Sequence, residues 1–241
     1  MEEYKPEITV ITPTHFRPDL LKRTIISVQN QTFKSYEHII VSDHCPYAKK
    51  VYDEFKSDNR IKFIENMRPH VKNVGSVGKN IGYENASSKI ICYCDDDNVY
   101  LPNHLEVMYR EFSKNIYDIV YTRYYHVPLG KGDGIIKQLC TRSIDDYSGY
   151  DHIGNTDNLN MGHTVSALKS CGGWKKDRPG KRDGEDTELM KRFDKMLSKT
   201  TLRISDITCI YYARAACIID DNEYKKELKK MKKDQIYVYD R

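Results

Sequence analysis

The chain has 241 residues, of which 39 are Lys or Arg and 35 are Asp or Glu, so its formal net charge is +4. A chain of this length forms one large domain or two small ones and buries enough surface to fold without disulfide or metal staples. Its charge is too small and too dispersed to indicate a nucleic-acid-binding protein. It has no signal-peptide pattern at its start and no apolar run of about 20 residues. We therefore expect a soluble, cytoplasmic protein.

Strands and helices are predicted to alternate over the first hundred residues. Short apolar runs indicate strands, and apolar residues spaced i, i+4, i+7 indicate helices, as with Leu21, Ile25 and Val28. The expected strands cover residues 7–12, 38–41, 61–64 and 90–94, and the expected helices begin near residues 18, 47 and 78. This alternation is typical of a mainly parallel α/β sheet with helices on both faces, which binds ligands at the carboxyl ends of its strands.

The later part of the chain is less regular. A helix is expected from Pro102, another carries an apolar stripe that begins at Leu189, and a strand is expected over residues 207–215. Residues 222–241 are predicted to form a basic amphipathic helix, with six Lys between residues 225 and 233. We favour a helix packed on the domain with a solvated Lys face, and the alternative is peripheral contact with an anionic membrane.

Polar residues follow three of the expected strands. They are Thr12 and Thr14, then Asp43, and then the triplet Asp95, Asp96 and Asp97. Because parallel strands end at one edge of a sheet, these side chains should converge. Three adjacent carboxylates repel one another, so they suit a site where a cation binds or water reaches them. Mg²⁺ and Mn²⁺ prefer such oxygen ligands and often bridge phosphates. The alternative is a solvated acidic turn that caps the next helix.

Several blocks of the sequence resemble glycosyltransferase family 2. They are GKNIGYENA at residues 78–86, IICYCDDDN at 90–98, GGW at 172–174 and GEDTEL at 184–189. The resemblance implies the GT-A (Rossmann-like) fold, with a single compact domain of two abutting halves. The nucleotide-sugar-binding half would span residues 1–98 and the acceptor-binding, catalytic half residues 99–219, followed by the basic helical tail at 220–241. The QxxRW motif of processive synthases is absent, which favours single addition.

The resemblance also implies which residues bind the nucleotide sugar. Asp43 matches the acid that binds the nucleobase, usually uracil, and Thr12 and Thr14 would line the same edge. Lys79 or Asn80 would contact the ribose or the phosphates. An equally good interpretation of Asn80 is that it fixes the loop before the fourth strand.

Metal and catalytic roles follow from the same resemblance. Asp97 would bind Mn²⁺ or Mg²⁺ with Asp95 as the alternative partner, and Asp96 would bind the ribose or a metal-bound water. Asp186 would act as the base that deprotonates the acceptor hydroxyl, and Glu185 is the second candidate. Acids in the first turn of a helix are also favoured by the helix dipole, which is the structural explanation for the pair.

The segment before this acid pair has five positive charges among residues 175–182. It is either a solvated loop or a lid over the diphosphate, in which Arg178 and Arg182 would contact the phosphates.

The implied activity is metal-dependent, inverting transfer of a sugar from a nucleoside diphosphate sugar, with UDP favoured. The acceptor would be a hydroxyl of a glycan, a lipid-linked acceptor or a protein-linked acceptor. Two alternatives are a nucleotidyltransferase acting on sugar phosphates and a non-catalytic binding protein with the same fold. A nucleotidyltransferase normally has a Gly-rich, basic loop after its first strand, where this chain has TPTHFR.

Overall fold

In a computed structural model the described residues are 5–67, 74–127, 140–141, 157–175 and 185–212, and all structural statements below refer to them. The strands are β1 (Ile8–Thr14), β2 (Tyr36–Ser42), β3 (Ile61–Glu65), β4 (Ile90–Tyr93), β5 (Val99–Tyr100), β6 (Ile119–Val127), β7 (Cys140–Thr141), β8 (Met161–Thr164) and β9 (Thr201–Tyr212). The helices are α1 (Pro18–Gln29), α2 (Pro46–Asp53), α3 (Val74–Glu84), α4 (His104–Phe112), α5 (Val165–Ser170) and α6 (Glu185–Leu197), with 3-10 turns at Asn158–Asn160 and Ser198–Thr200.

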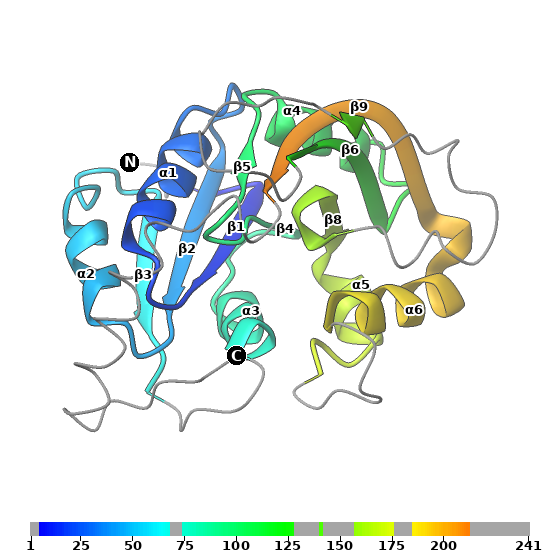
Figure 1. The fold of residues 1–241 in the computed structure, drawn as a ribbon. Helices are drawn as coiled ribbons and strands as arrows, with labels where there is room; N and C mark the ends of the chain where they lie inside the picture. The colour runs from blue at the N-terminus through cyan, green and yellow to red at the C-terminus, as the bar shows by residue number, and fades with distance from the viewer. Residues whose placement is uncertain (1–4, 68–73, 128–139, 142–156, 176–184, 213–241) are drawn as a thin grey trace.

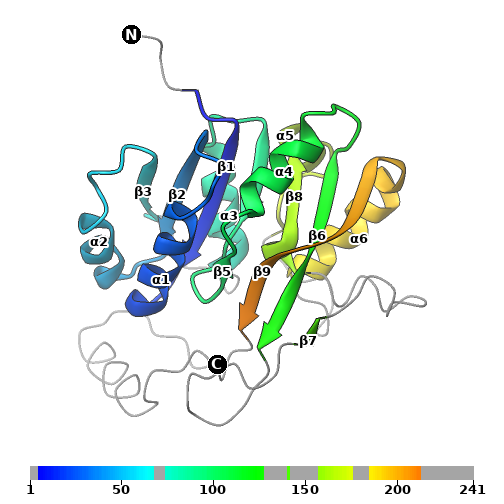
Figure 2. The ribbon, with the colours of Figure 1, turned by 90° about the horizontal axis from the view of Figure 1, so that it is seen from above.

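These strands form one mixed sheet in the order β3-β2-β1-β4-β8-β6-β9-β5, with β7 paired to β6 (Figures 1 and 2). The predicted alternation is confirmed in the N-terminal half, where β3, β2, β1 and β4 are all parallel. Helices α1, α2 and α3 connect these four strands in turn. Their carboxyl ends therefore lie at one edge of the sheet, as expected.

The C-terminal half of the sheet is mixed rather than parallel throughout. Strand β8 is antiparallel to both β4 and β6, whereas β6 and β9 are parallel to each other. Strand β9 begins at Thr201, earlier than the strand expected from residue 207, because the polar Arg203 and Asp206 hide the start of the strand in the apolar pattern. Antiparallel pairs of this kind need no connecting helix, so the strand–helix alternation in the sequence did not reveal them.

Helices α1, α2 and α4 cover one face of the sheet, and α3, α5 and α6 cover the other (Figure 1). Alternate residues of β1 divide between the two faces, as the pleat of a strand requires. Val10 belongs to the apolar cluster that contains Leu105 of α4, and Ile11 belongs to the cluster that contains Leu189 and Phe193 of α6. Of the apolar stripe predicted for α6, Leu189 and Phe193 are buried, whereas Met196 is 53% exposed.

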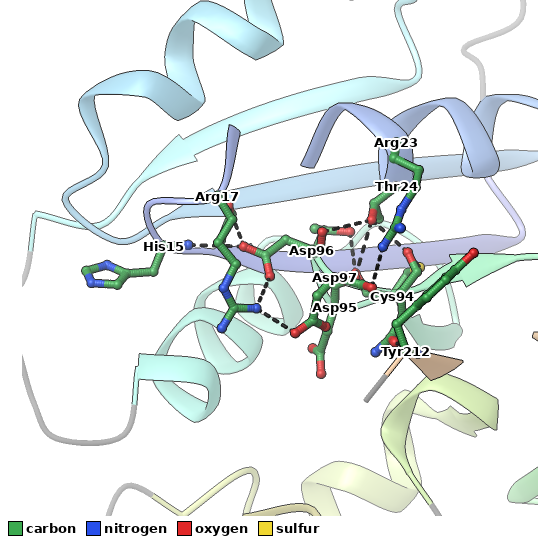
Figure 3. Close-up of polar contacts among 12 residues, drawn as sticks. His15, Arg17, Arg23, Thr24, Cys94, Asp95, Asp96, Asp97 and Tyr212 are labelled. Carbon is green, nitrogen blue, oxygen red and sulfur yellow. Dashed lines mark hydrogen bonds and ion pairs between the residues drawn. The ribbon is translucent and has the colours of Figure 1, made fainter. Parts of the chain in front are cut away.

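The turn that follows β4 is held by α1. The Thr24 hydroxyl donates to Asn98 O at 2.7 Å, and Arg23 Nη2 donates to Asp97 O at 2.6 Å (Figure 3). The Arg23 guanidinium also lies 4.1 Å from the ring centre of Tyr212, at the end of β9. Two neighbouring residues of α1 thus fix the backbone of this turn, and one of them also packs on the end of β9.

The basic tail predicted for residues 220–241 lies outside the described residues. Among the helices that are described, none has the length and apolar character needed to cross a membrane.

Thr24→Val should weaken the fold, because it keeps the side-chain shape but removes the donor to the carbonyls of Asp96 and Asn98. We expect the free energy of unfolding in urea to fall by about 1–3 kcal/mol. The control is Thr32→Val, whose exposed hydroxyl donates to Glu106, and its effect should stay below about 0.5 kcal/mol. Equal losses in the two variants would contradict the anchoring role of Thr24.

Candidate active site

The edge at the ends of β1 and β2 holds Asp43, which is 4% exposed. Asn66 Nδ2 donates to Asp43 Oδ1 at 2.6 Å, and His15 Nδ1 lies 2.8 Å from Asp43 O. Thr12 is also buried here, and its hydroxyl donates to Cys94 O at 2.8 Å. Asp43 therefore lies at the predicted edge, whereas Thr12 braces β1 against the end of β4.

Arg17 bridges two carboxylates of the triplet (Figure 3). Its Nη1 donates to Asp96 Oδ1 at 2.9 Å and to Asp97 Oδ2 at 2.6 Å. The other oxygen of Asp96 accepts from the Thr14 hydroxyl at 2.8 Å and from His15 N at 3.3 Å. Burial raises the pKa of Asp96 to about 6, against the effect of Arg17 and with the help of Asp97. The predicted cluster at the strand ends therefore forms, with Arg17 at its centre.

Lys79 of α3 lies among carboxylates from two distant parts of the chain. Its Nζ is 3.1 Å from Asp186 Oδ1, 3.6 Å from Glu185 Oε1 and 3.7 Å from Asp95 Oδ1. It also lies 4.5 Å from the ring centre of Trp174. Burial works to lower the pKa of Lys79, but the three carboxylates outweigh it and hold the pKa above its usual value. The buried ammonium therefore stays charged and joins the acids after β4 to the acid pair that begins α6.

Glu185 and Asp186 have different surroundings. Glu185 Oε2 accepts a hydrogen bond from Ser76 N at 2.8 Å, at the N-terminal end of α3, where the helix dipole favours an anion. Gly75 permits this approach, since a Cβ at that position would collide with the Glu185 carboxylate. Asp186 instead accepts a hydrogen bond from Lys79. Glu185 thus contacts both the backbone of α3 and the ammonium, whereas Asp186 lies closer to the ammonium.

Two acids beside Lys79 have raised pKa values. Burial raises the pKa of Asp186 to about 6, with Lys79 opposing this rise and Asp95 adding to it. Burial and the charges of Asp186 and Asp95 also raise the pKa of Asp157, which precedes the 3-10 turn Asn158–Asn160. Asp157 is therefore a further member of this acidic cluster.

Asn80 fixes the turn formed by Gly172, Gly173 and Trp174. Its Nδ2 donates to Trp174 O at 2.7 Å, and its Oδ1 accepts from Trp174 N at 3.0 Å. The two glycines have φ of 80° and 74°, a region that glycine adopts without strain. Trp174 Nε1 in turn donates to the hydroxyl of Tyr93 at 2.8 Å. These contacts are those of a loop-fixing residue, although the loop is this distant turn and not the one before β4.

Comparison with known proteins supplies the family. The sequence profile described as "Glycosyl transferase family 2" matches residues 9–169. This chain belongs to glycosyltransferase family 2. The GKNIGYENA and IICYCDDDN motifs lie within the matched residues, whereas GGW and GEDTEL lie beyond them.

One sequence relative and two solved structures are similar to this family 2 protein. The GalNAc(5)-diNAcBac-PP-undecaprenol β-1,3-glucosyltransferase of Campylobacter jejuni is 34% identical over 111 residues, which are 45% of this chain and 35% of that relative. Staphylococcus aureus TarS in complex with UDP-GlcNAc superposes with a TM-score of 0.67 at 12% identity, covering 93% of this chain and 65% of TarS. The mannosyltransferase PcManGT of Pyrobaculum calidifontis, in complex with GDP-Man and Mn²⁺, gives a TM-score of 0.64 at 13% identity, covering 94% and 61%. The predicted GT-A fold is confirmed. The matched residues cover only part of each of these proteins, from 35% to 65% of their length.

The oxygen donors of the Asp96–Asp97 pair fit a divalent metal. Asp96 and Asp97 direct carboxylate oxygens at one cationic atom, Arg17 Nη1, and hard divalent cations prefer such ligands. Asp95, predicted as the alternative partner of Asp97, accepts from Asn158 Nδ2 at 3.1 Å. Within the described residues, no group of three or more His, Cys, Asp or Glu side chains is gathered as a metal site. Phosphate oxygens and water are further ligands of the kind that such a cation accepts.

Sequence reasoning assigned no role to Arg17 or Asp157. Arg17 lies in the TPTHFR segment directly after β1, so its place at a strand end was a usable signal. Asp157 lies in a stretch that matches no motif, and no pattern distinguished it. The two predicted lid residues, Arg178 and Arg182, lie outside the described residues.

Asp186→Asn should be more stable than the wild-type protein at pH 7.5. A raised pKa means that ionising Asp186 works against folding. Protonated Asp186 contributes fully to the free energy of unfolding below the unfolded pKa of 3.8. This contribution is lost as the pH rises through about 6, the pKa in the folded protein. The two proteins should therefore converge near pH 4 in urea unfolding experiments.

The control for this prediction is Glu188→Gln on the same helix. Burial works to raise the pKa of Glu188, but hydrogen bonds from Arg192 and Lys175 outweigh it and lower the pKa. This variant should therefore be less stable than wild type at neutral pH, with the difference closing as the pH falls. The same sign of change in both variants would contradict the electrostatic assignment.

Proposed function

We propose that this chain is a metal-dependent glycosyltransferase that moves a sugar from a nucleoside diphosphate sugar to an acceptor hydroxyl, with inversion at the anomeric carbon. One observation carries the proposal: Lys79 brings Asp95, after β4, together with Asp186, at the start of α6. Acids at the end of β4 suit the metal and diphosphate of a donor. An acid that faces them from α6 suits the binding of the acceptor hydroxyl and the removal of its proton.

Asp186 is the proposed base. A pKa of about 6 leaves it mainly ionised near pH 7 but close enough to that pH to accept a proton efficiently. Glu185 is the weaker candidate, because one of its oxygens already accepts from Ser76 N. The acceptor oxygen bonds to the anomeric carbon as the bond to the diphosphate breaks, and Asp186 takes the hydroxyl proton. A single displacement of this kind inverts the anomeric configuration.

The other residues would bind and orient the donor. Lys79 holds the Asp186 carboxylate in place through its 3.1 Å hydrogen bond. Asp96 and Asp97 would hold Mg²⁺ or Mn²⁺, and a bound metal would neutralise the charge that develops on the departing diphosphate. Asp43 would bind the nucleobase at the end of β2.

The relatives support a nucleotide-sugar donor and suggest an acceptor class. Solved TarS structures contain UDP or UDP-GlcNAc, and the PcManGT structure contains GDP-Man. We favour UDP because Asp43 matches the acid that family members use for uracil. The name of the C. jejuni relative describes an undecaprenol-linked acceptor. A lipid-linked glycan is therefore our first choice of acceptor, ahead of free glycans and proteins, and it would suit membrane contact by the basic tail.

Thermal unfolding with UDP, GDP, CDP or TDP, each with and without Mn²⁺, tests the donor site. We expect UDP with Mn²⁺ to raise the unfolding temperature, because a ligand at 100 times its Kd adds about 2.7 kcal/mol to stability. The shift should disappear in Asp97→Asn and persist in Asp53→Asn, which removes an exposed acid paired with Lys49. No shift with any nucleotide would favour the non-catalytic alternative. Turnover that releases pyrophosphate instead of a nucleoside diphosphate would favour the nucleotidyltransferase.

Kinetics of two variants test the base. Asp186→Asn should lower kcat by about 10²- to 10⁴-fold, because a positioned general base contributes a factor of this size. Glu185→Gln should have a smaller effect, since Glu185 serves mainly the end of α3. Release of nucleoside diphosphate from the donor, with a panel of glycan acceptors, measures both. Normal turnover in Asp186→Asn together with its loss in Glu185→Gln would reverse the assignment.

A further inference from the structure

Arg17 sits where a cation shared by Asp96 and Asp97 must sit. The carboxylates are 6% and 14% exposed, and both direct an oxygen at the same guanidinium nitrogen, at 2.9 Å and 2.6 Å. The third acid of the triplet, Asp95, faces a different cation, Lys79. The Asp96–Asp97 pair therefore has its own counter-ion, supplied by the chain itself (Figure 3).

The backbone before Arg17 shows that this placement is held against a local cost. Phe16 has φ of 52°, a conformation that bulky residues rarely adopt. It lies between the end of β1 and Pro18, the first residue of α1. Both flanking elements are anchored in the apolar core through Ile11 and Leu21. The chain thus turns sharply between two fixed elements, and this turn carries Arg17 to the triplet.

We propose that Arg17 is an internal counter-ion that competes with the divalent cation for Asp96 and Asp97. A guanidinium and a divalent cation cannot occupy the same position between two carboxylates. Mg²⁺ or Mn²⁺ should therefore bind weakly to the donor-free protein and bind well only with the nucleotide. The diphosphate supplies further oxygen ligands to the metal and an anion for the displaced guanidinium. This inference deepens the proposed function, because it concerns the metal and nucleotide of the same site.

The size of the effect follows from the contacts that the metal must displace. Arg17 makes two charge-assisted hydrogen bonds to the pair, and such bonds are stronger than neutral ones. Removing them should tighten the binding of Mn²⁺ alone by about tenfold or more, which corresponds to about 1.4 kcal/mol. Without Arg17, the metal no longer needs the nucleotide to displace the guanidinium. Each ligand should therefore increase the affinity of the other less, and by the same factor, because coupling between two ligands is reciprocal.

The test is the Kd of Mn²⁺ alone, measured by electron paramagnetic resonance at pH 8 for wild type and Arg17→Met. The matched control is Arg23→Met, which also removes one guanidinium near the triplet. Among the described residues, Arg23 donates a hydrogen bond to the carbonyl of Asp97 and none to a carboxylate. We expect the Kd to fall about tenfold or more in Arg17→Met, because the bridge between the two carboxylates is lost. In Arg23→Met only a nearby charge is lost, so the Kd should fall less than about threefold. Adding Asp97→Asn to Arg17→Met should abolish the gain.

An unchanged Kd in Arg17→Met, or an equal gain in both single variants, would overturn the inference. Arg17→Lys serves if Arg17→Met fails to fold, because it keeps a charge for folding but loses the planar guanidinium. An intermediate gain in that variant supports the inference, and no gain overturns it. UDP binding is measured in parallel: its absence in wild type would count against the proposed function, while the comparison of Mn²⁺ affinities would still decide the role of Arg17.

Discussion

The site depends on the burial of one positive charge, the Lys79 ammonium. Removing an ammonium from water is costly unless acids surround it, and Lys79 finds them on Asp95 after β4 and on Asp186 of α6. The same charge offsets the repulsion among those acids and Asp157. The ring of Trp174 packs against the ammonium as well. Placing α6 beside α3 is therefore required both to stabilise Lys79 and to assemble the two acidic motifs.

Two cations pair with different members of the acidic triplet. Arg17 forms ion pairs with Asp96 and Asp97, and Lys79 forms one with Asp95. Three adjacent carboxylates would otherwise repel one another at the end of a buried strand. The division makes the triplet compatible with a folded protein before any donor arrives. It also separates the acids that a metal would use from Asp95, which shares Lys79 with the proposed base.

Much of this arrangement was predictable, because strand periodicity and parallel topology together place strand ends at one edge. Asp43 and the triplet follow apolar runs, so the pattern of the sequence alone brought them together. Asp186 needed the family resemblance, since an acid in a first helical turn has a simpler explanation. The contacts of Arg17 depend on the turn at Phe16, and those of Asn80 depend on a turn far along the chain. Periodicity carries no information about loop conformation or about such distant partners.

The loops at the strand ends also contain unfavourable backbone conformations and unfavourably placed charges. Phe16 and His44 follow β1 and β2 and adopt positive φ, which is costly for residues other than glycine. Asp96 and Asp186 have raised pKa values, so their ionisation works against folding. A sequence that is locally consistent elsewhere tolerates such conflicts where they serve binding or proton transfer. The two raised pKa values are electrostatic costs, and the proposed donor, with its diphosphate and a divalent cation, would bring charges of both signs to these acids. Binding of that donor can therefore recover stability that the free protein gives up at these residues.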